Sequence, residues 1–195
     1  MTALRRTILD KAVELVAEHG VRGVSFREVA RRAEVSHQAP YHHFGNLQGI
    51  LEAIAREGFA QLAATMQSAA NQAGEDALER LTAAGTAYVR FAISHLGYFR
   101  VMFQRSLVEL HDELSPIEEA QETFGTLVTL AEDAWKAGHG SHMAVEVLSL
   151  LAWSTVHGLA ILIVEGTIAS KPNLPPEDVL IDQVVGALSG LLKAP

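Results

Sequence analysis

The sequence predicts an all-α protein with about nine helices. Apolar residues recur every three or four positions through nearly every segment of the 195 residues, which is the period of an amphipathic helix. No segment shows the sustained alternation of apolar and polar residues that is typical of a strand. Residues that start and stop helices stand between the periodic segments, so the boundaries agree with the period.

Two helices are expected before residue 34. The first carries an apolar stripe over residues 4–19 and ends at Gly20, because glycine is common just after a helix. Ser25 and Glu28 fit a capping box, in which the two side chains reciprocally satisfy free amides at a helix start. A second, short helix therefore begins at Ser25.

A third short helix and a long helix follow. Ser36 is expected to cap a short helix that runs through His43. Asn46 is expected to cap the long helix, which Asn71–Gly74 breaks. The remaining elements are, in chain order, a helix over 75–95, an aromatic turn over 97–103, a helix from Ser115-Pro116 to about 137, an apolar helix over 143–168, a rigid linker over 171–176 and a last striped helix over about 180–192.

The composition excludes several kinds of site. The chain has no cysteine, which removes disulfides, thiolate zinc sites and cysteine nucleophiles and fits a reducing compartment. Its start enters an amphipathic pattern directly, without the features of a cleavable signal peptide. We therefore expect a cytoplasmic protein with no membrane partner.

The chain is also unusually apolar. Hydrophobic residues make up 49% and charged residues only 19%, against roughly 25% charged in an ordinary domain. A homo-oligomer interface, an apolar ligand cavity or a membrane span could each account for the excess. The span candidate, Met143–Val164, contains Glu146 and His157, which are costly at bilayer depth. Burial against the chain's own domain and a partner explains this helix better.

The net charge of -8 is unevenly distributed. Residues 1–60 carry eight basic and seven acidic side chains, whereas the other 135 residues carry seven basic and sixteen acidic ones. The acidity therefore belongs to the C-terminal part. The N-terminal part can still present a basic face to phosphate groups.

Residues Ser25–Phe44 have the layout of a helix-turn-helix, whose second helix enters the DNA major groove. The stretch Val24–Ser36, followed by Tyr41-His-His-Phe44, resembles the signature of the tetracycline-repressor (TetR) family. The resemblance covers about residues 4–56. It implies a helix-turn-helix DNA-binding domain over 1–46, joined by a long helix to a ligand-binding and dimerisation domain over 47–195.

The resemblance also implies which residues contact DNA. Ser25 and Arg27 would meet phosphate groups at a helix start. Gln38 suits adenine, and the Ala39 methyl suits a thymine methyl. Tyr41 would touch phosphate or pack as a core ring. The complete predicted set is Ser25, Arg27, Ser36, His37, Gln38, Ala39, Tyr41 and His42.

Some positions depart from the family pattern. Leu47 stands where the family commonly has a phosphate-binding lysine, and Gly45 where it often has a basic residue or proline. Pro40 removes an amide donor from the third helix unless it lies in the first turn, so we expect a short, tightened helix. Arg5 and Arg6 would form either an arm that reaches DNA or a frayed terminus.

The C-terminal part resembles one subgroup of the family. Ala152–Leu159 resembles its Trp-His-Gly (WHG) element, and Phe99–Phe103 the aromatic element before it. This resemblance implies that the last two helices form a homodimer and that a small-molecule effector binds between the middle helices. Glycines at 158, 186 and 190 would let the dimer helices approach closely.

Apolar and aromatic residues of the middle helices are the candidates for effector binding, although any one such residue is more often part of an ordinary core than a ligand contact. Tyr88, Trp153 and His157 are favoured because they can orient a polar group in an apolar cavity. The complete candidate set is Phe59, Leu62, Met66, Tyr88, Phe91, Phe99, Met102, Phe103, Phe124, Leu127, Trp153 and His157.

The expected function is a ligand-responsive transcriptional regulator, specifically a homodimeric repressor that a small, largely apolar molecule releases from a palindromic DNA operator. The alternative is a ligand- or partner-binding helical dimer without DNA binding, which Leu47 and Pro40 favour. An enzyme is not expected, since the acidic residues follow solvent faces of helices. No cofactor or metal site is expected: His139 and His142 lie on a glycine-rich loop without an obvious third ligand.

Overall fold

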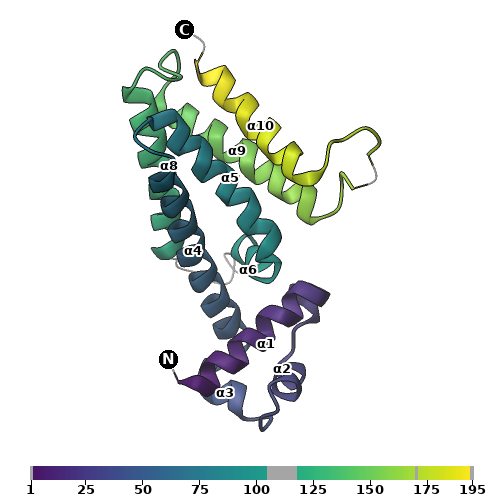
Figure 1. Cartoon of the computed structure of the whole chain (residues 1–195). Coiled ribbons are helices and arrows are strands. Elements are labelled where there is room, and N and C mark those ends of the chain that lie inside the picture. The colour runs from purple at the N-terminus through teal and green to yellow at the C-terminus, as the bar shows by residue number, and fades with distance from the viewer. Residues whose placement is uncertain (1, 105–117, 170, 194–195) are drawn as a thin grey trace. The chain divides into compact units, whose positions relative to one another are not determined.

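The computed structural model describes residues 2–104, 118–169 and 171–193, and these residues form helices joined by turns, without a strand among them (Figure 1). The helices are α1 (Ala3–His19), α2 (Phe26–Arg32), α3 (Ala39–Phe44), α4 (Leu47–Gln72), α5 (Ala77–Ser94), α6 (Leu96–Met102), α8 (Glu118–Lys136), α9 (Val145–Val164) and α10 (Glu177–Lys193), with a 3-10 turn over Val21–Gly23. The all-α prediction is confirmed.

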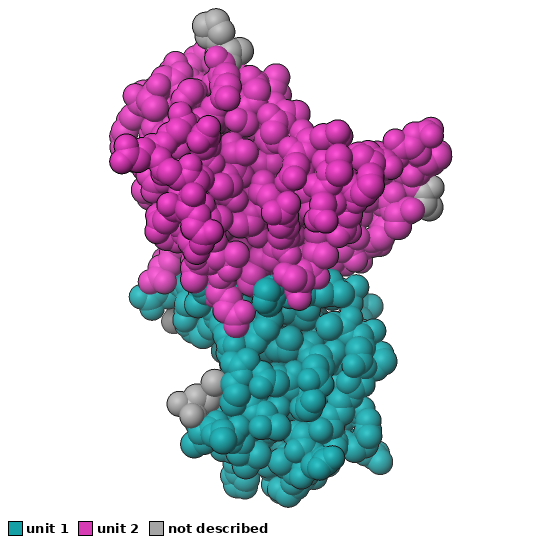
Figure 2. Space-filling model, viewed as in Figure 1, with its two compact units in different colours: residues 1–60, 95–120 teal, residues 61–94, 121–195 magenta. Residues whose placement is uncertain are grey.

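The chain divides into two compact units, which Figure 2 distinguishes by colour. Unit 1 comprises residues 1–60 and 95–120, and unit 2 comprises residues 61–94 and 121–195. Unit 1 therefore contains α1 to α3, the first part of α4 and α6. The predicted functional boundary between residues 46 and 47 concerns DNA binding rather than compactness, and it stays a prediction.

Unit 1 is built around α1, which buries Ile8, Leu9, Ala12, Leu15 and Val16, whereas Leu4 at the start of its apolar stripe is 42% exposed. Thr2 caps this helix by accepting a hydrogen bond from the Arg5 amide at 3.3 Å. Gly20 ends it with a φ of 70°, a left-handed conformation that glycine adopts without strain. The core side chains of unit 1 include Ile8, Leu9, Leu15, Val29, Ile50, Ile54 and Phe99.

In unit 2, α5 packs against both α9 and α10. The buried side chains of these three helices include Leu78, Leu81, Leu148, Val156, Ile181, Val185 and Leu192. The other side of α9 and α10 leaves apolar side chains exposed, among them Val147, Leu150, Leu151, Ile161, Leu162, Val179 and Leu191. The apolar surplus of the sequence is therefore divided between a core and a surface.

Three expected elements differ from the structure. Residues 97–103 were expected to form a turn, but Leu96–Met102 is the helix α6. Ser36 does not cap α3: Gln38 occupies the N-cap position, and the Ser36 backbone carbonyl accepts from the Ala39 amide in a turn. The apolar helix α9 ends at Val164 rather than at residue 168, and Gly166 follows it with a φ of 67°.

Two further expectations concern helix starts. Arg5 and Arg6 lie in the first two turns of α1, so the expected arm or frayed terminus is wrong. The helix start expected at Ser115-Pro116 lies outside the described residues, and α8 is described from Glu118 onward.

Candidate nucleic-acid interface and effector region

The eight residues predicted to contact DNA lie on α2, α3 and the turn between them. Ser25 caps α2, where its hydroxyl accepts from the Glu28 amide at 3.3 Å as the sequence predicts. All eight side chains are exposed except Ala39, which is half-buried. The structure thus gathers the set on one continuous stretch of chain surface, although contact with DNA stays a prediction.

The turn between α2 and α3 places one residue in an unusual conformation. Glu34 has a φ of 55°, the left-handed region that side chains other than glycine rarely adopt. Backbone hydrogen bonds hold this conformation: the Val35 amide donates to the Ala30 carbonyl at 3.1 Å and the Glu34 amide to the Arg31 carbonyl at 3.3 Å. They fix the change of direction that leads the chain into α3.

Pro40 is compatible with α3 because it lies in the first turn, where helical amides have no partner within the helix. The helix is short, as predicted, and spans only six residues. Tyr41 packs on its neighbour as one of its two expected roles requires, and contact with phosphate stays a prediction. Its ring edge packs on Phe26 with centroids 4.5 Å apart, and the residue is nevertheless 46% exposed.

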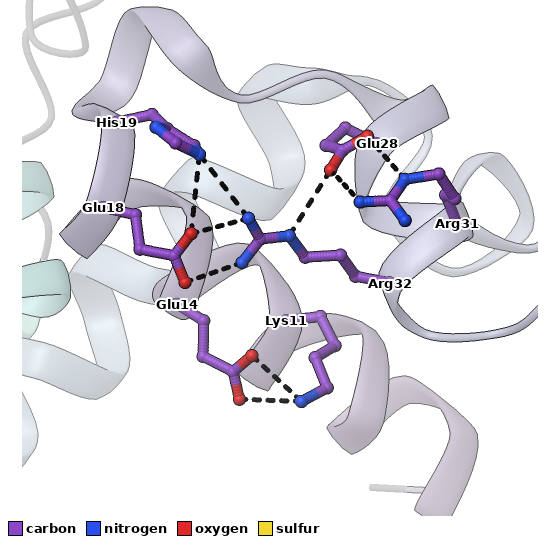
Figure 3. Close-up of polar contacts among 7 residues, drawn as sticks. All are labelled: Lys11, Glu14, Glu18, His19, Glu28, Arg31 and Arg32. Atoms are coloured by element: carbon purple, nitrogen blue, oxygen red, sulfur yellow. Dashed lines mark hydrogen bonds and ion pairs between the residues drawn. The ribbon is translucent and has the colours of Figure 1, made fainter.

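An ion-pair network joins α1 to α2 (Figure 3). Arg32 donates two hydrogen bonds to the Glu18 carboxylate, at 2.8 and 2.6 Å, and approaches Glu28 at 3.4 Å. Arg31 donates two hydrogen bonds to the Glu28 carboxylate, at 2.9 and 2.6 Å. His19 lies 3.4 Å from the same Glu18 carboxylate. We refer to Glu18, His19, Glu28, Arg31 and Arg32 as the α1–α2 network.

The α1–α2 network changes the charges that face DNA. The Arg31 guanidinium lowers the pKa of Glu28 to about 2, and Glu18 raises the pKa of Arg32. The Glu28 carboxylate thus accepts hydrogen bonds from Arg31 and Arg32. The expected capping box had assigned it to a backbone amide at the start of α2. Sequence reasoning missed this use of Arg31 and Arg32, although the spacing of Glu28 and Arg31 along one helix was a usable signal.

Arg22 and Arg27 differ from these paired arginines. Both side chains are exposed, and neither joins an ion pair with another residue in the described part of the chain. Their charge is therefore available to an external anion such as phosphate. Arg27 was among the predicted contacts, whereas Arg22, just before α2, was not.

The N-terminal arginines are engaged within unit 1. Arg6 pairs with Asp10 and Glu57 and donates to the Tyr98 hydroxyl at 3.2 Å, and these carboxylates raise its pKa. Arg5 lies over the Phe44 ring, 4.6 Å from its centroid. Arg6 is thus a structural residue.

The start of α4 follows the prediction at Asn46, whose side chain accepts from the Gly49 amide at 2.8 Å. Gly45 ends α3 with a φ of 73°, a conformation that explains glycine at this position. Leu47 is 36% exposed, so an apolar side chain occupies a surface position at the helix start.

The effector candidates are divided between the two units. Phe59, Phe99, Met102 and Phe103 belong to unit 1, and the other eight belong to unit 2. In unit 1, the Phe103 ring lies 5.5 Å from Phe59 and 5.1 Å from Phe99. In unit 2, Leu62, Met66, Phe91 and Leu127 are buried, so ordinary core packing also explains them.

The three favoured polar candidates meet in unit 2. The Tyr88 hydroxyl lies 2.8 Å from His157 Nδ1, and Trp153 also hydrogen-bonds to Tyr88. Burial raises the pKa of Tyr88 and lowers the pKa of His157. Burial therefore favours a neutral phenol and a neutral imidazole, which share the hydrogen bond between the Tyr88 hydroxyl and His157 Nδ1.

Aromatic rings extend this cluster toward the surface. The Trp153 ring lies 5.8 Å from His157 and 5.5 Å from Phe124, which is 43% exposed. We refer to Tyr88, Trp153, His157 and Phe124 as the aromatic cluster. A shallow groove of about 450 Å³ elsewhere in unit 2 contains none of the effector candidates; it is lined by Ala64, Thr65, Ser68, Ala69, Gln72 and Ala87.

The described residues also bear on metal binding and on membrane insertion. No three of their His, Asp and Glu side chains are placed to hold a metal ion. One described helix, α9, is long and apolar enough to cross a membrane, a property that core helices share.

Comparison with known proteins agrees with this arrangement. The profile described as "Bacterial regulatory proteins, tetR family" matches residues 8–54, and "Tetracyclin repressor-like, C-terminal domain" matches residues 81–188. The second match covers more than half of the chain. The WHG subgroup is not separately identified by these matches.

Individual relatives are regulators as well. The HTH-type transcriptional regulator YobS of Bacillus subtilis is 28% identical over 160 residues, 82% of this chain and 78% of the relative. The repressor AcnR of Corynebacterium efficiens is 37% identical over 62 residues, 32% of this chain and 33% of the relative. A regulatory protein of the tetR family from Rhodococcus RHA1 shares the fold, with 22% identity, a TM-score of 0.79 and full coverage of both chains. The chain belongs to the TetR family of DNA-binding transcriptional regulators and is not an enzyme.

Proposed function

We propose that this regulator is a cytoplasmic homodimeric repressor that leaves a palindromic operator when a small, largely apolar effector binds. The observation that carries the proposal is the exposed set of polar and aromatic side chains on α2, α3 and their turn. A helix-turn-helix of this kind reads base edges with its second helix and phosphates with its first.

The roles within this surface follow from chemistry. Gln38 has no capping hydrogen bond from its side chain, so its amide is available for the paired donor and acceptor of adenine. Arg27 and Arg22 offer charge to phosphates on either strand. His37 and Tyr41, whose ring centroids are 6.1 Å apart, form a stacked pair beside the reading residue.

The exposed apolar side of α9 and α10 supports the homodimer. Leu150 is 56% exposed and Leu191 is 68% exposed, and glycines at 158, 186 and 190 have open space where a Cβ would stand. Two such helices from each subunit would form an apolar four-helix interface. A two-fold dimer places two recognition helices in successive major grooves, roughly 34 Å apart.

The aromatic cluster supports effector binding in unit 2. A neutral His157 held by Tyr88 can donate a hydrogen bond, and Trp153 and Phe124 offer apolar faces. An effector would act by favouring a different separation of the recognition helices. Moving DNA occupancy from 99:1 to 1:99 requires about 5.5 kcal/mol of differential affinity between the two conformations.

The test is to select a duplex with the full-length protein from a random-sequence library and to measure its affinity as a function of salt. We expect a palindromic site whose affinity falls with salt by a slope of about -0.9 per phosphate contact. Leu47 predicts a shallower slope than the variant Leu47→Lys gives. A protein that remains dimeric and selects no duplex at low salt would be a ligand- or partner-binding dimer instead.

A further inference from the structure

The short helix α6 contacts α1 and α4 at several points within unit 1. The helix α1 packs extensively on α6. Four residues of this seven-residue helix contact α1 or α4: Gly97, Tyr98, Arg100 and Met102.

Two glycines set how closely the helices approach. A Cβ on Gly97 would lie 2.3 Å from the Val13 carbonyl oxygen of α1, so this backbone contact admits no side chain. A Cβ on Gly58 of α4 would lie 2.7 Å from the sulfur of Met102. The backbone of α6 therefore lies close to the backbone of α1 at Gly97, and α6 side chains occupy the space beside Gly58 of α4, so a small displacement would break packing contacts.

Tyr98 links all three helices through its hydroxyl. The hydroxyl donates to the Glu57 carboxylate of α4 at 2.8 Å and accepts from the Arg6 guanidinium of α1 at 3.2 Å. Arg6 also pairs directly with Glu57. Because Tyr98 is buried, these charge-assisted bonds lie partly shielded from solvent, where such bonds are stronger.

Arg100 fastens the other end of α1. Its guanidinium donates to the Ala17 carbonyl at 2.9 Å, within the last turn of the helix. Carbonyls in the last turn lack partners within the helix, and the negative end of the helix dipole favours a cation there. Tyr98 and Arg100 thus hold α1 near its start and near its end, while α1 itself carries α2 through the α1–α2 network.

We propose that α6 positions the DNA-binding helices, with Tyr98 and Arg100 as the positioning residues that keep α1 in one orientation. The proposal rests on DNA binding by this regulator. It states that α6 raises the affinity for DNA although α6 does not itself contact DNA. Loss of either residue releases one end of α1, so α2 and α3 sample orientations that do not fit the groove.

The test compares Tyr98→Phe and Arg100→Met with the wild type in full-length protein. Tyr98→Phe keeps the ring and removes only the hydroxyl. We expect each variant to bind the duplex selected by the wild type about tenfold more weakly, the size of a lost hydrogen bond to a charged group. Arg100→Lys, which keeps a cationic donor, should recover part of the loss. Binding equal to the wild type in both removal variants would overturn the proposal.

The control separates positioning from stability. Arg80→Met removes a partly buried arginine from unit 2, where it lies 3.9 Å from Asp133. Affinity is measured well below the melting temperature, where nearly every molecule is folded and a small loss of stability leaves binding unchanged. An equal loss of affinity in Arg80→Met and Arg100→Met would show a general effect and overturn the proposal.

A second readout does not require DNA. Amide hydrogen exchange over residues 3–19 should speed up in Tyr98→Phe and Arg100→Met but not in Arg80→Met. If the wild type selects no duplex, the proposed repressor function fails. Hydrogen exchange alone then tests whether α6 holds α1 in place. Unchanged exchange in both removal variants would then reject the positioning role.

Discussion

The DNA-binding surface of unit 1 and the exposed side of α9 and α10 in unit 2 differ in which side chains meet solvent. In unit 1, charged residues around α2 are largely paired, and polar and aromatic side chains beside them are exposed. In unit 2, a polar group such as His157 lies half-buried in hydrogen-bonded contact, whereas leucines are exposed. Under the proposed function each surface receives a partner of its own chemistry: a polar, charged duplex for one and a second apolar face for the other.

The charge distribution gives the same contrast. Residues 1–60 are nearly balanced in charge, and the rest of the chain carries the acidity. An acidic unit 2 repels phosphate, so we expect attraction to DNA to be confined to the proposed recognition surface. The following changes test this division, beginning with the largest expected effect.

Leu150→Glu should prevent dimerisation. Leu150 is largely exposed in the single chain, so the substitution should leave the subunit folded, but a dimer would have to bury an unpaired carboxylate on each side. We expect the dimer dissociation constant to rise at least about a hundredfold, with a parallel loss of DNA affinity. Sedimentation measures the first and a binding titration the second. Leu174→Glu, in the exposed linker, is the matched control, and an unchanged dimer in Leu150→Glu would contradict the assignment of this face.

Gln38→Ala should weaken binding at one base position. Loss of a bidentate contact costs about 1–3 kcal/mol, roughly tenfold to a hundredfold in affinity. The variant should no longer distinguish the wild-type duplex from one in which the contacted base pair is replaced. Gln67→Ala, on an exposed part of α4 in unit 2, provides the control. An equal loss of affinity for every duplex, specific or not, would show that Gln38 contacts the DNA backbone instead of a base.

Arg27→Met should weaken binding to all sequences alike. A phosphate contact carries no base information, so we expect a loss that is uniform across duplexes and a salt slope reduced by about one. Arg90→Met removes the same charge from unit 2 and should leave the slope unchanged. If both variants lower the slope equally, the effect of Arg27 is one of net charge and not of position.

His157→Gln should reduce the sensitivity of unit 2 to acid. Burial lowers the pKa of His157 below its usual 6.5, so the unfolded chain takes up a proton at a higher pH than the folded chain. Stability in the wild type therefore falls as the pH drops below 6.5 toward the folded pKa. Between pH 7.5 and pH 5, the melting temperature should fall less in His157→Gln than in the wild type. In the exposed control His142→Gln it should fall as much as in the wild type. A variant as acid-sensitive as the wild type would place the responsible group elsewhere.

Local signals in the sequence predicted much of the fold. Ser25 and Asn46 cap their helices, and Gly20 ends α1, because each depends on residues within a few positions. The helix α6 was not predictable in this way. Gly97 disfavours a helix, and its conformation is fixed by contact with Val13, which is far away in the sequence.

In the candidate sites, too, features that depend on neighbouring residues were predictable, and features that depend on distant residues were not. The helical register placed the recognition residues on exposed positions, since α2 and α3 follow from local capping and turn chemistry. The pairing of Arg32 with Glu18 joins two helices and could not be inferred from spacing along one of them. The sequence therefore overstated the number of arginines available to DNA.

The separation of the α1–α2 network from the exposed reading residues has a consequence for evolution. The side chains that hold α2 in place are Glu18, Glu28 and Arg32, whereas Gln38 and its exposed neighbours form no part of that network. Mutations at Gln38 should therefore have little effect on the stability of unit 1. If Gln38 reads a base as proposed, a duplicated copy of the gene can acquire a preference for another base pair at that position while the protein remains folded.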